Sequence, residues 1–294
     1  MQEANTAIAH CDSPVASIHF LGLDLADLDT AAAGAMIAAR PPGAPFAYIV
    51  TPNAQHFVLL DRERKALARA TQSYPMAKSP GRLTDAYNHA WLRLSDSQVV
   101  RLLARLFHGL RLPLAAGSDL TAWLFANVIK PNDTITVIGG DAELERRLRA
   151  QFHLTRLSLH APPMGYINNQ EAVAACVDFV RAHPARFIFL ATGAPQSEYL
   201  AQRLSQERGI TGVGLCIGGS LLFITGITTR APVIFRRLGL EWLHRVLSNP
   251  RRFVRRLFVD SVPVIPMVMR DAFSRQRLIS ADSKQHDIDG RDSA

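Results

Sequence analysis

Five short polar clusters in this 294-residue sequence combine residue types that could bind a sugar or phosphate and activate a hydroxyl group. They are Thr51-Pro-Asn53, Ser95-Asp96-Ser97, Gly117-Ser118-Asp119, Gly139-Gly140-Asp141 and Gln196-Ser-Glu198. A carboxylate such as Asp96 can take a proton from a hydroxyl group, while hydroxyls and amides orient the reacting molecule. His56 and His160 lie in similar loops and are alternative bases.

A basic stretch near the C-terminus could bind anions. Residues 230–277 contain 11 Arg against three acids, an excess equal to the net charge of +8 of the whole chain. The arginines that we assign to membrane or diphosphate contact are Arg236, Arg237 and Arg245 on one amphipathic segment, and Arg251, Arg252, Arg255 and Arg256 after Pro250. An anionic membrane surface, a diphosphate or nucleic acid would fit, and so would a solvated helix face. No nucleic-acid-binding module surrounds the stretch, so we expect no nucleic-acid partner.

Each polar cluster also has a structural explanation. Thr51, Asn53 or Asp96 could cap the helix that follows it, and Asp119 could favour a helix dipole. Asp27-Leu-Asp29 matches a short motif that holds nucleotide diphosphates through a metal ion, but its place before a helix favours capping. We therefore predict no metal site and no cofactor.

The elements that position these clusters alternate between strands and helices from about residue 46 to 227. Apolar runs at 46–50 and 134–138 predict buried strands, and further strands are expected at 155–159, 187–191 and within 212–219, with a shorter one at 90–94. Helices follow most of them. This alternation predicts a doubly wound α/β fold with a mainly parallel sheet and helices on both faces. Open sheets of this kind bind ligands at the carboxyl ends of their strands, where the polar clusters lie.

Composition sets the domain organisation. A chain with 48% apolar and 20% charged residues can bury a substantial core. We predict an α/β core over 1–229, a basic helical appendage over 230–279 and a disordered tail over 280–294. The sequence shows no secretory signal and no apolar run of the roughly 18 to 20 residues that a membrane span needs, so we expect a cytoplasmic protein.

Several of these motifs resemble those of the WecG/TagA/CpsF family of bacterial glycosyltransferases. The resembling segments are Arg230-Ala-Pro, Arg237-Leu-Gly-Leu-Glu-Trp-Leu-His-Arg, Asn249-Pro-Arg-Arg, Thr51-Pro-Asn53, Asp96-Ser97 before Val99-Val100, Gly117-Ser-Asp119 and Gly193-Ala-Pro-x-x-Glu198. The resemblance extends over about residues 51–256. It implies that Thr51 and Asn53 belong to the active site and that Asp96 is the general base.

The resemblance also implies a reaction. An inverting, metal-independent enzyme would move a hexose or N-acetylhexosamine of the N-acetylmannosamine type from a UDP-sugar to a polyprenyl-diphosphate-linked sugar. This step builds exopolysaccharide, teichoic acid or a related surface polymer, so we expect a peripheral location on the inner face of the cell membrane. The substrate-binding residues would be Ser118, Asp119, Gly139, Gly140, Tyr166, Gln196 and Glu198. A homo-oligomer would also fit the apolar helices.

The sequence departs from the family pattern at three positions. Leu114 stands near the place of an Arg, Leu222 at the place of an Asp, and the amide of Gln196 is offset by one residue. These departures favour an alternative function, a catalytically impaired relative that binds a nucleotide sugar or a lipid-linked intermediate.

Overall fold

The computed structural model describes residues 15–70, 82–229 and 261–274, together with the single residues Pro232, Phe235 and Val259. Its first element is an antiparallel hairpin of β1 (Ser17–Phe20) and β2 (Leu23–Ala26). Asp29 then begins α1 (Thr30–Ala39), because its Oδ1 accepts a hydrogen bond from Ala32 N at 2.8 Å. The second acid of Asp27-Leu-Asp29 is thus a helix cap, as its position before the helix favours.

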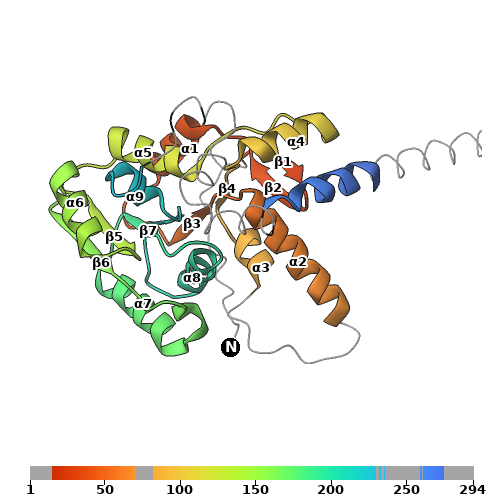
Figure 1. Cartoon of the computed structure of the whole chain (residues 1–294). Coiled ribbons are helices and arrows are strands. Elements are labelled where there is room, and N and C mark those ends of the chain that lie inside the picture. The colour runs from red at the N-terminus through yellow and green to blue at the C-terminus, as the bar shows by residue number, and fades with distance from the viewer. Residues whose placement is uncertain are drawn as a thin grey trace, which may run out of the picture.

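Six parallel strands form the central sheet. They are β3 (Ala47–Val50), β4 (Leu92–Arg93), β5 (Thr134–Ile138), β6 (Arg156–His160), β7 (Phe187–Leu190) and β8 (Val213–Cys216). Their order across the sheet is β4-β3-β8-β7-β5-β6 (Figure 1), and every pairing is parallel. After β5 the chain continues to β6, which is its neighbour on one side in the sheet. After β7 it continues to β8, which lies in the opposite direction across the sheet. The neighbours β5 and β7 therefore flank a point where the winding reverses.

Helices cover both faces of this sheet, so the predicted doubly wound fold is confirmed. One face packs against α1, α5 (Gly117–Asn127), α6 (Ala142–Phe152) and α9 (Ser220–Ile224). The other packs against α2 (Ala54–Ala70), α3 (Leu83–Asn88), α7 (Gln170–Ala182) and α8 (Gln196–Ser205). Alternate residues of one strand serve the two faces: Phe187 and Phe189 pack on the first side, and Ile188 and Leu190 on the second.

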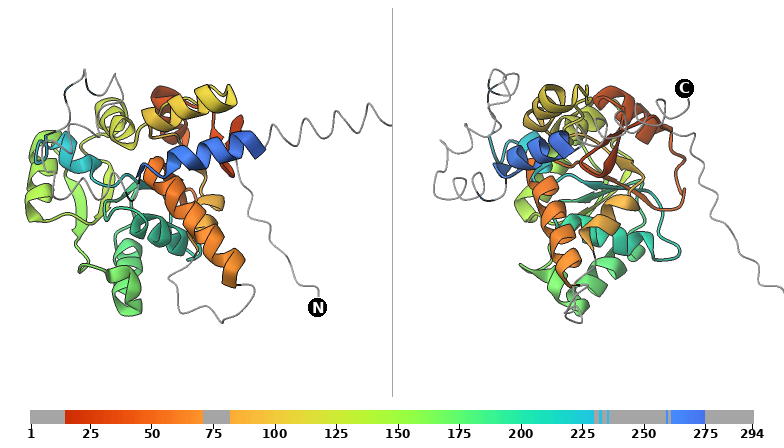
Figure 2. Two further views of the ribbon diagram at one scale, coloured as in Figure 1. Left: turned by 45° about the vertical axis from the view of Figure 1, so that its right-hand side comes forward. Right: turned by 90° about the vertical axis from the view of Figure 1, so that its right-hand side faces the viewer.

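The remaining helices lie at the edge of the sheet. The helix α4 (Gln98–His108) packs beside the hairpin, and a 3₁₀ turn, η1 (Tyr166–Asn168), precedes α7. Residues 264–274 are also helical and lie alongside α4 and α2 (Figure 2). Val264 and Val268 of this segment belong to the same core cluster as the hairpin, and Asp271 Oδ2 lies 3.8 Å from His108 Nε2. Part of the predicted appendage thus packs on the α/β core.

Several predicted features lie outside the described residues. They are the loop 71–81, the arginines of 236–256, the N-terminal segment 1–14 and the predicted tail 280–294. The proposed domain boundaries therefore stay a prediction. Within the described ranges, no helix has the length and apolar content to cross a membrane.

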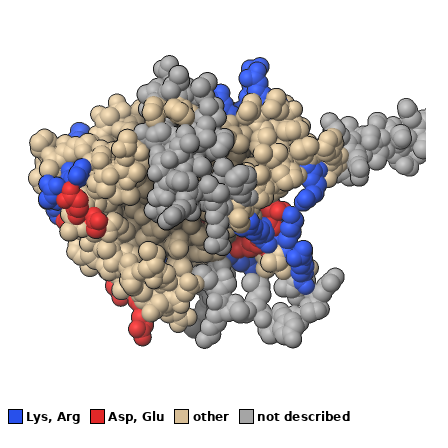
Figure 3. Space-filling model, in the orientation of Figure 1, with Lys and Arg blue, Asp and Glu red and all other residues tan. Residues whose placement is uncertain are grey.

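Charged side chains of both signs gather over α6 and α2 on the face seen in Figure 3. On α6 they pair with one another at helical spacing, as in the Glu145–Arg149 contact of 2.8 Å. Exposed pairs of this kind contribute little to stability. The buried sheet and its apolar faces therefore provide most of the stabilisation.

Glu63 on α2 caps the short helix α3. Its carboxylate accepts hydrogen bonds from Leu83 N at 2.7 Å, Thr84 N at 2.8 Å and Thr84 Oγ1 at 2.6 Å. We predict that Glu63→Ala lowers the free energy of unfolding by about 1–2 kcal/mol, measured by urea denaturation. The control Asp61→Ala removes only a surface pair with Lys65 and should cost at most about 0.5 kcal/mol. Equal losses in the two variants would show that α3 does not depend on this cap.

Candidate active site

The first polar clusters meet because β3 pairs with β4. Leu94 N donates to Val50 O at 2.9 Å, which extends the ladder beyond the strands. Asp96 N then donates to Pro52 O at 3.1 Å. The backbone of Asp96 therefore lies directly beside Thr51-Pro52-Asn53, as the sequence predicts for residues that follow neighbouring parallel strands.

Thr51 brings two further segments to this place. Its hydroxyl donates to Cys216 O at the end of β8, with the oxygens 3.3 Å apart. Gly117, the first residue of α5, lies so close that a Cβ atom there would be 3.0 Å from Thr51 Oγ1. Ala115 N donates to Ser95 O at 2.9 Å and fastens the segment that leads into α5. Thr51, Asp96 and the amino end of α5 thus form one group, which we call the β3 site.

The capping explanations have different outcomes. Ser97, not Asp96, is the N-cap residue of α4, since Ser97 Oγ accepts a hydrogen bond from Val100 N at 3.3 Å. Asn53 does help to begin α2, because its Oδ1 accepts from Gln55 N at 3.0 Å. Asp119 lies in the first turn of α5, a helix without a side-chain cap. The half-buried Asp96 is therefore not needed to begin its helix.

The two alternative bases fit less well than Asp96. His56 Nδ1 accepts a hydrogen bond from Asn53 N at 3.1 Å, so a neutral His56 carries its proton on Nε2 and its basic lone pair on Nδ1 is already engaged. His160 ends β6, five strand spacings from β4. At about 4.8 Å per spacing, that places His160 about 24 Å from the strand that precedes Asp96.

The end of β7 is held by a chain of hydroxyl contacts. Tyr166 Oη lies 3.1 Å from Thr192 Oγ1, which is 3.2 Å from Ser197 Oγ, and Ser197 donates to Leu190 O at 3.0 Å. The side-chain amide of Gln196 donates to Gly193 O at 3.0 Å. Tyr166 and Gln196 therefore shape the loop that begins α8.

The glycine turn after β5 is required by close packing. A Cβ atom on Gly139 would lie 2.9 Å from the carbonyl carbon of Ala191, and its φ is +104°. Gly140 has a φ of +88°, and Asp141 Oδ1 then caps α6 by accepting from Leu144 N at 2.9 Å. Because a carboxylate already occupies this helix end, the turn is a poorer place for a phosphate than we expected.

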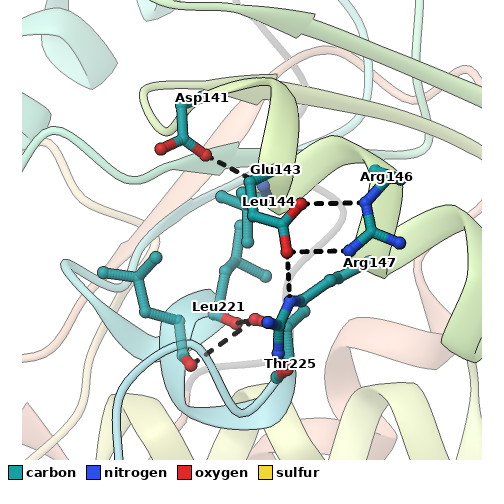
Figure 4. A network of polar contacts seen from close by, with 8 residues as sticks. Asp141, Glu143, Leu144, Arg146, Arg147, Leu221 and Thr225 are labelled. Carbon is teal, nitrogen blue, oxygen red and sulfur yellow. Dashed lines mark hydrogen bonds and ion pairs between the residues drawn. The ribbon is translucent and has the colours of Figure 1, made fainter.

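A polar network joins α6 to α9 (Figure 4). Glu143 accepts from Arg146 and Arg147, at 2.8 and 2.7 Å, and these hydrogen bonds lower the pKa of Glu143 to about 2. Arg147 Nη1 also donates to Thr225 O at 3.2 Å, at the end of α9. The network fixes the helix that follows the last strand.

Glu198 lies inside the protein instead of lining its surface. Its side chain is 2% exposed, and burial raises its pKa from 4.5 to about 7. The negative charge of Glu198 contributes to raising the pKa values of four tyrosines and one thiol: Tyr48, Tyr87, Tyr166, Tyr199 and Cys216. We call Glu198 and these five side chains the tyrosine cluster.

The model of the glycosyl transferase WecG/TagA/CpsF family matches residues 18–278. The chain belongs to this family of glycosyltransferases. The match includes both the sheet and the helix at 264–274, and the family resemblance noted in the sequence is confirmed. Family membership makes the protein a glycosyltransferase of surface-polymer synthesis, which in general uses a nucleotide-sugar donor and a lipid-linked acceptor.

The fold separates the predicted site residues into groups. Thr51, Asn53, Asp96, Ser118 and Asp119 belong to the β3 site or its immediate sequence neighbours. Gly139, Gly140, Tyr166 and Gln196 lie at the ends of β5 and β7, and the predicted arginines lie outside the described residues. The sequence analysis did not name Tyr87 as a candidate, because no motif or spacing around α3 distinguishes this tyrosine from an ordinary core residue. In the described part of the chain, no three His, Cys, Asp or Glu side chains are grouped to hold a metal ion.

We predict that Gly139→Ala is costly because the added methyl group would contact backbone atoms of Ala191. The expected loss is about 2–4 kcal/mol in the free energy of unfolding, measured in urea. Gly209→Ala is the matched control, since Gly209 has a φ of +81° with open space around it. It should lose only about 1 kcal/mol, the cost of the left-handed backbone. A control that loses as much as Gly139→Ala would exclude the close approach as the cause.

The raised pKa of Glu198 predicts a pH-dependent stability difference. A folded-state pKa of about 7 against an ordinary 4.5 means that stability is full below pH 4.5 and falls as the pH rises through 7. The loss by pH 8 is about 3 kcal/mol. The side-chain amide in the variant Glu198→Gln cannot ionise. The free energy of unfolding of this variant minus that of wild type should therefore increase by about that amount from pH 5 to pH 8.

Urea unfolding at both pH values measures this difference. Glu207→Gln, which removes a carboxylate paired with Arg181 and Arg203 at the surface, is the control and should show no such gain at pH 8. An unchanged difference between Glu198→Gln and wild type would mean that Glu198 is ionised throughout.

Proposed function

We propose that the protein is an inverting, metal-independent transferase that moves a hexose or N-acetylhexosamine from a UDP-sugar to a polyprenyl-diphosphate-linked sugar. The observation that carries this proposal is the β3 site, where Asp96 lies beside Thr51-Pro52-Asn53 and the amino end of α5. The site provides a carboxylate, hydroxyls and an amide at the carboxyl edge of a parallel sheet. These are the groups that a sugar transfer to a hydroxyl requires.

Asp96 is the proposed general base. The acceptor hydroxyl oxygen attacks the anomeric carbon on the face opposite to the diphosphate, and the bond from that carbon to the diphosphate oxygen breaks. Asp96 takes the hydroxyl proton as the new C–O bond forms, and UDP leaves with the electron pair. Asn53 and Thr51 orient the reactants, and the configuration at the anomeric carbon inverts. Tyr166 and Gln196, which hold the loop before α8, keep that helix in place.

The departing diphosphate needs positive potential without a metal ion. The amino end of α5 lacks a side-chain cap, so its first N–H groups can donate to phosphate oxygens. In this proposal the hydroxyl of Ser118 is a further hydrogen-bond donor to the phosphates. The arginines of the basic stretch provide the positive charge that balances the diphosphate. The glycine turn of Gly139 and Gly140 instead faces the sugar.

We also propose that the enzyme is peripheral on the inner face of the cell membrane, where its lipid-linked acceptor lies. Each of the seven arginines near an anionic surface would contribute about 1 kcal/mol. Val262, Ile265 and Phe273 at the C-terminal helix are exposed apolar residues, which supports contact with lipid. A second copy of the chain could cover the same residues in a homo-oligomer.

The alternative function is a binding subunit that recognises the nucleotide sugar or the lipid-linked intermediate without turnover. Leu222 favours it, because this residue packs against the apolar cluster of α5 and α6 where the family tends to have an Asp. Leu114 likewise offers no charge near the β3 site.

We predict UDP release when the purified protein is incubated with its UDP-sugar donor and a short-chain polyprenyl-diphosphate sugar without added metal. A panel of UDP-sugars identifies the donor. Asp96→Asn should lower the rate by about 10²- to 10⁴-fold, the usual contribution of a general base. Asp24→Asn, on the exposed face of β2, is the control and should keep the wild-type rate.

Two outcomes would change this assignment. If Asp96→Asn keeps the full rate, Asp96 is not the base. If no donor is turned over while UDP still binds in calorimetry, the protein is the binding subunit of the alternative.

A further inference from the structure

Besides Ser95 Oγ within the β3 site, two buried polar atoms on helices that pack against each other have no hydrogen-bond partner in the described part of the chain. They are Glu198 Oε2 on α8 and the hydroxyl of Tyr87 on α3, and the two helices pack against each other. Tyr87 is completely buried and Glu198 nearly so. An unsatisfied buried polar group is costly and uncommon in a stable fold. Two of them on adjacent helices therefore suggest a role in function.

The fold holds Tyr87 firmly in this position. Glu63 caps the beginning of α3, and the hydroxyl of Tyr48 on β3 donates to Ala86 O. At the other end of α3, the guanidinium of Arg93 donates to Tyr87 O at 3.1 Å and to Asp24 O at 2.7 Å. Contacts from α2, β3 and β4 thus fix a helix of only six residues.

The pKa of Tyr87 depends on the charges of both Glu198 and Asp96. Burial raises the pKa of Tyr87 most, and the charges of Glu198, Cys216 and Asp96 raise it further. The ring of Tyr87 is also 6.2 Å from the ring of His56, which accepts from Asn53 N. Tyr87 therefore stays neutral, with its hydroxyl proton in place, and its pKa responds to the charge of both carboxyl groups.

Glu198 is surrounded by groups that are neutral at physiological pH. The titratable groups on which its charge acts are Tyr48 on β3, Tyr87 on α3, Tyr166 on η1, Tyr199 on α8 and Cys216 on β8. Cys176 also acts on Tyr166, and the carboxylate of Glu63 also acts on Tyr199. In the described residues no Lys or Arg favours its charge, and its own backbone N–H alone opposes the effect of burial. Its carboxyl group is thus stable in this place mainly as the neutral acid.

We propose that Glu198 and Tyr87 form a buried positioning pair for Asp96 and Asn53, and that the pair supports sugar transfer only while Glu198 keeps its proton. This inference rests on the proposed transferase function. It differs from the sequence interpretation, in which Glu198 contacts the substrate directly.

The physical reason is the charge that ionisation would create. A neutral carboxyl group needs no counter-charge in this apolar place and leaves α3 and α8 packed together. An ionised Glu198 would be an uncompensated charge among tyrosines, and it would draw in water or move the helices apart.

The pH dependence of turnover tests this pair. We predict that kcat of the wild type for UDP release falls as the pH rises through about 7, with KM nearly unchanged. Glu198→Gln imitates the neutral acid, so it should keep the rate seen at low pH and lose this fall. Glu198→Ala and Tyr87→Phe should lower kcat about 10- to 100-fold, because they remove a partner that positions the site. Glu207→Gln should keep both the rate and the profile of the wild type.

The outcomes separate this inference from the function on which it rests. If wild type turns over no donor, the transferase proposal fails and the pair fails with it. If wild type is active and Glu198→Gln has the same pH profile, only the pair is wrong. A folded Glu198→Gln that is as slow as Glu198→Ala would also overturn it, since the neutral amide should replace the neutral acid.

Discussion

The parallel pairing of β3 with both β4 and β8 is the constraint on which the candidate site depends. These ladders place the ends of three strands side by side, and the hydrogen bonds continue beyond them into Leu94 and Asp96. Backbone groups that are paired in this way leave the side chains of the strand-end residues for other contacts. Segments 165 residues apart, at Thr51 and Cys216, therefore meet with an oxygen–oxygen distance of 3.3 Å.

The two halves of the sheet edge have different physical characters. Around β3, the amino end of α5 has no side-chain cap, and Asp96 is a half-buried carboxylate that does not cap its helix. Around β5, Asp141 already satisfies the first turn of α6, and Gly139 is required by its distance to Ala191. A glycine turn before a helix can thus serve either phosphate binding or close backbone packing. A side-chain cap on the helix, as at Asp141, favours the packing explanation. This difference supports our proposal that the sugar transfer takes place on the β3 side.

Burial gives acidic residues different roles in this fold. Glu143 is exposed and forms ion pairs, whereas Glu198 lies among tyrosines with a raised pKa. Both are glutamates in the first turn of a helix, so the difference comes from the surroundings alone. The tyrosine cluster connects α8, α3 and β3, and the ring of Tyr87 in this cluster lies 6.2 Å from the ring of His56.

The sequence by itself determined the fold class, the strand-end clusters and the family. Continuous apolar runs such as 46–50 and 134–138 can only be buried between two layers of helices, and the polar residues after them must share one edge. The tertiary structure decided which clusters meet, because strand order depends on packing between distant segments. It placed His160 at the far edge from Asp96, made Ser97 the cap of α4 and buried Glu198 against Tyr87. Local spacing carries no information on these contacts, since each joins residues whose distance along the chain does not set their distance in space.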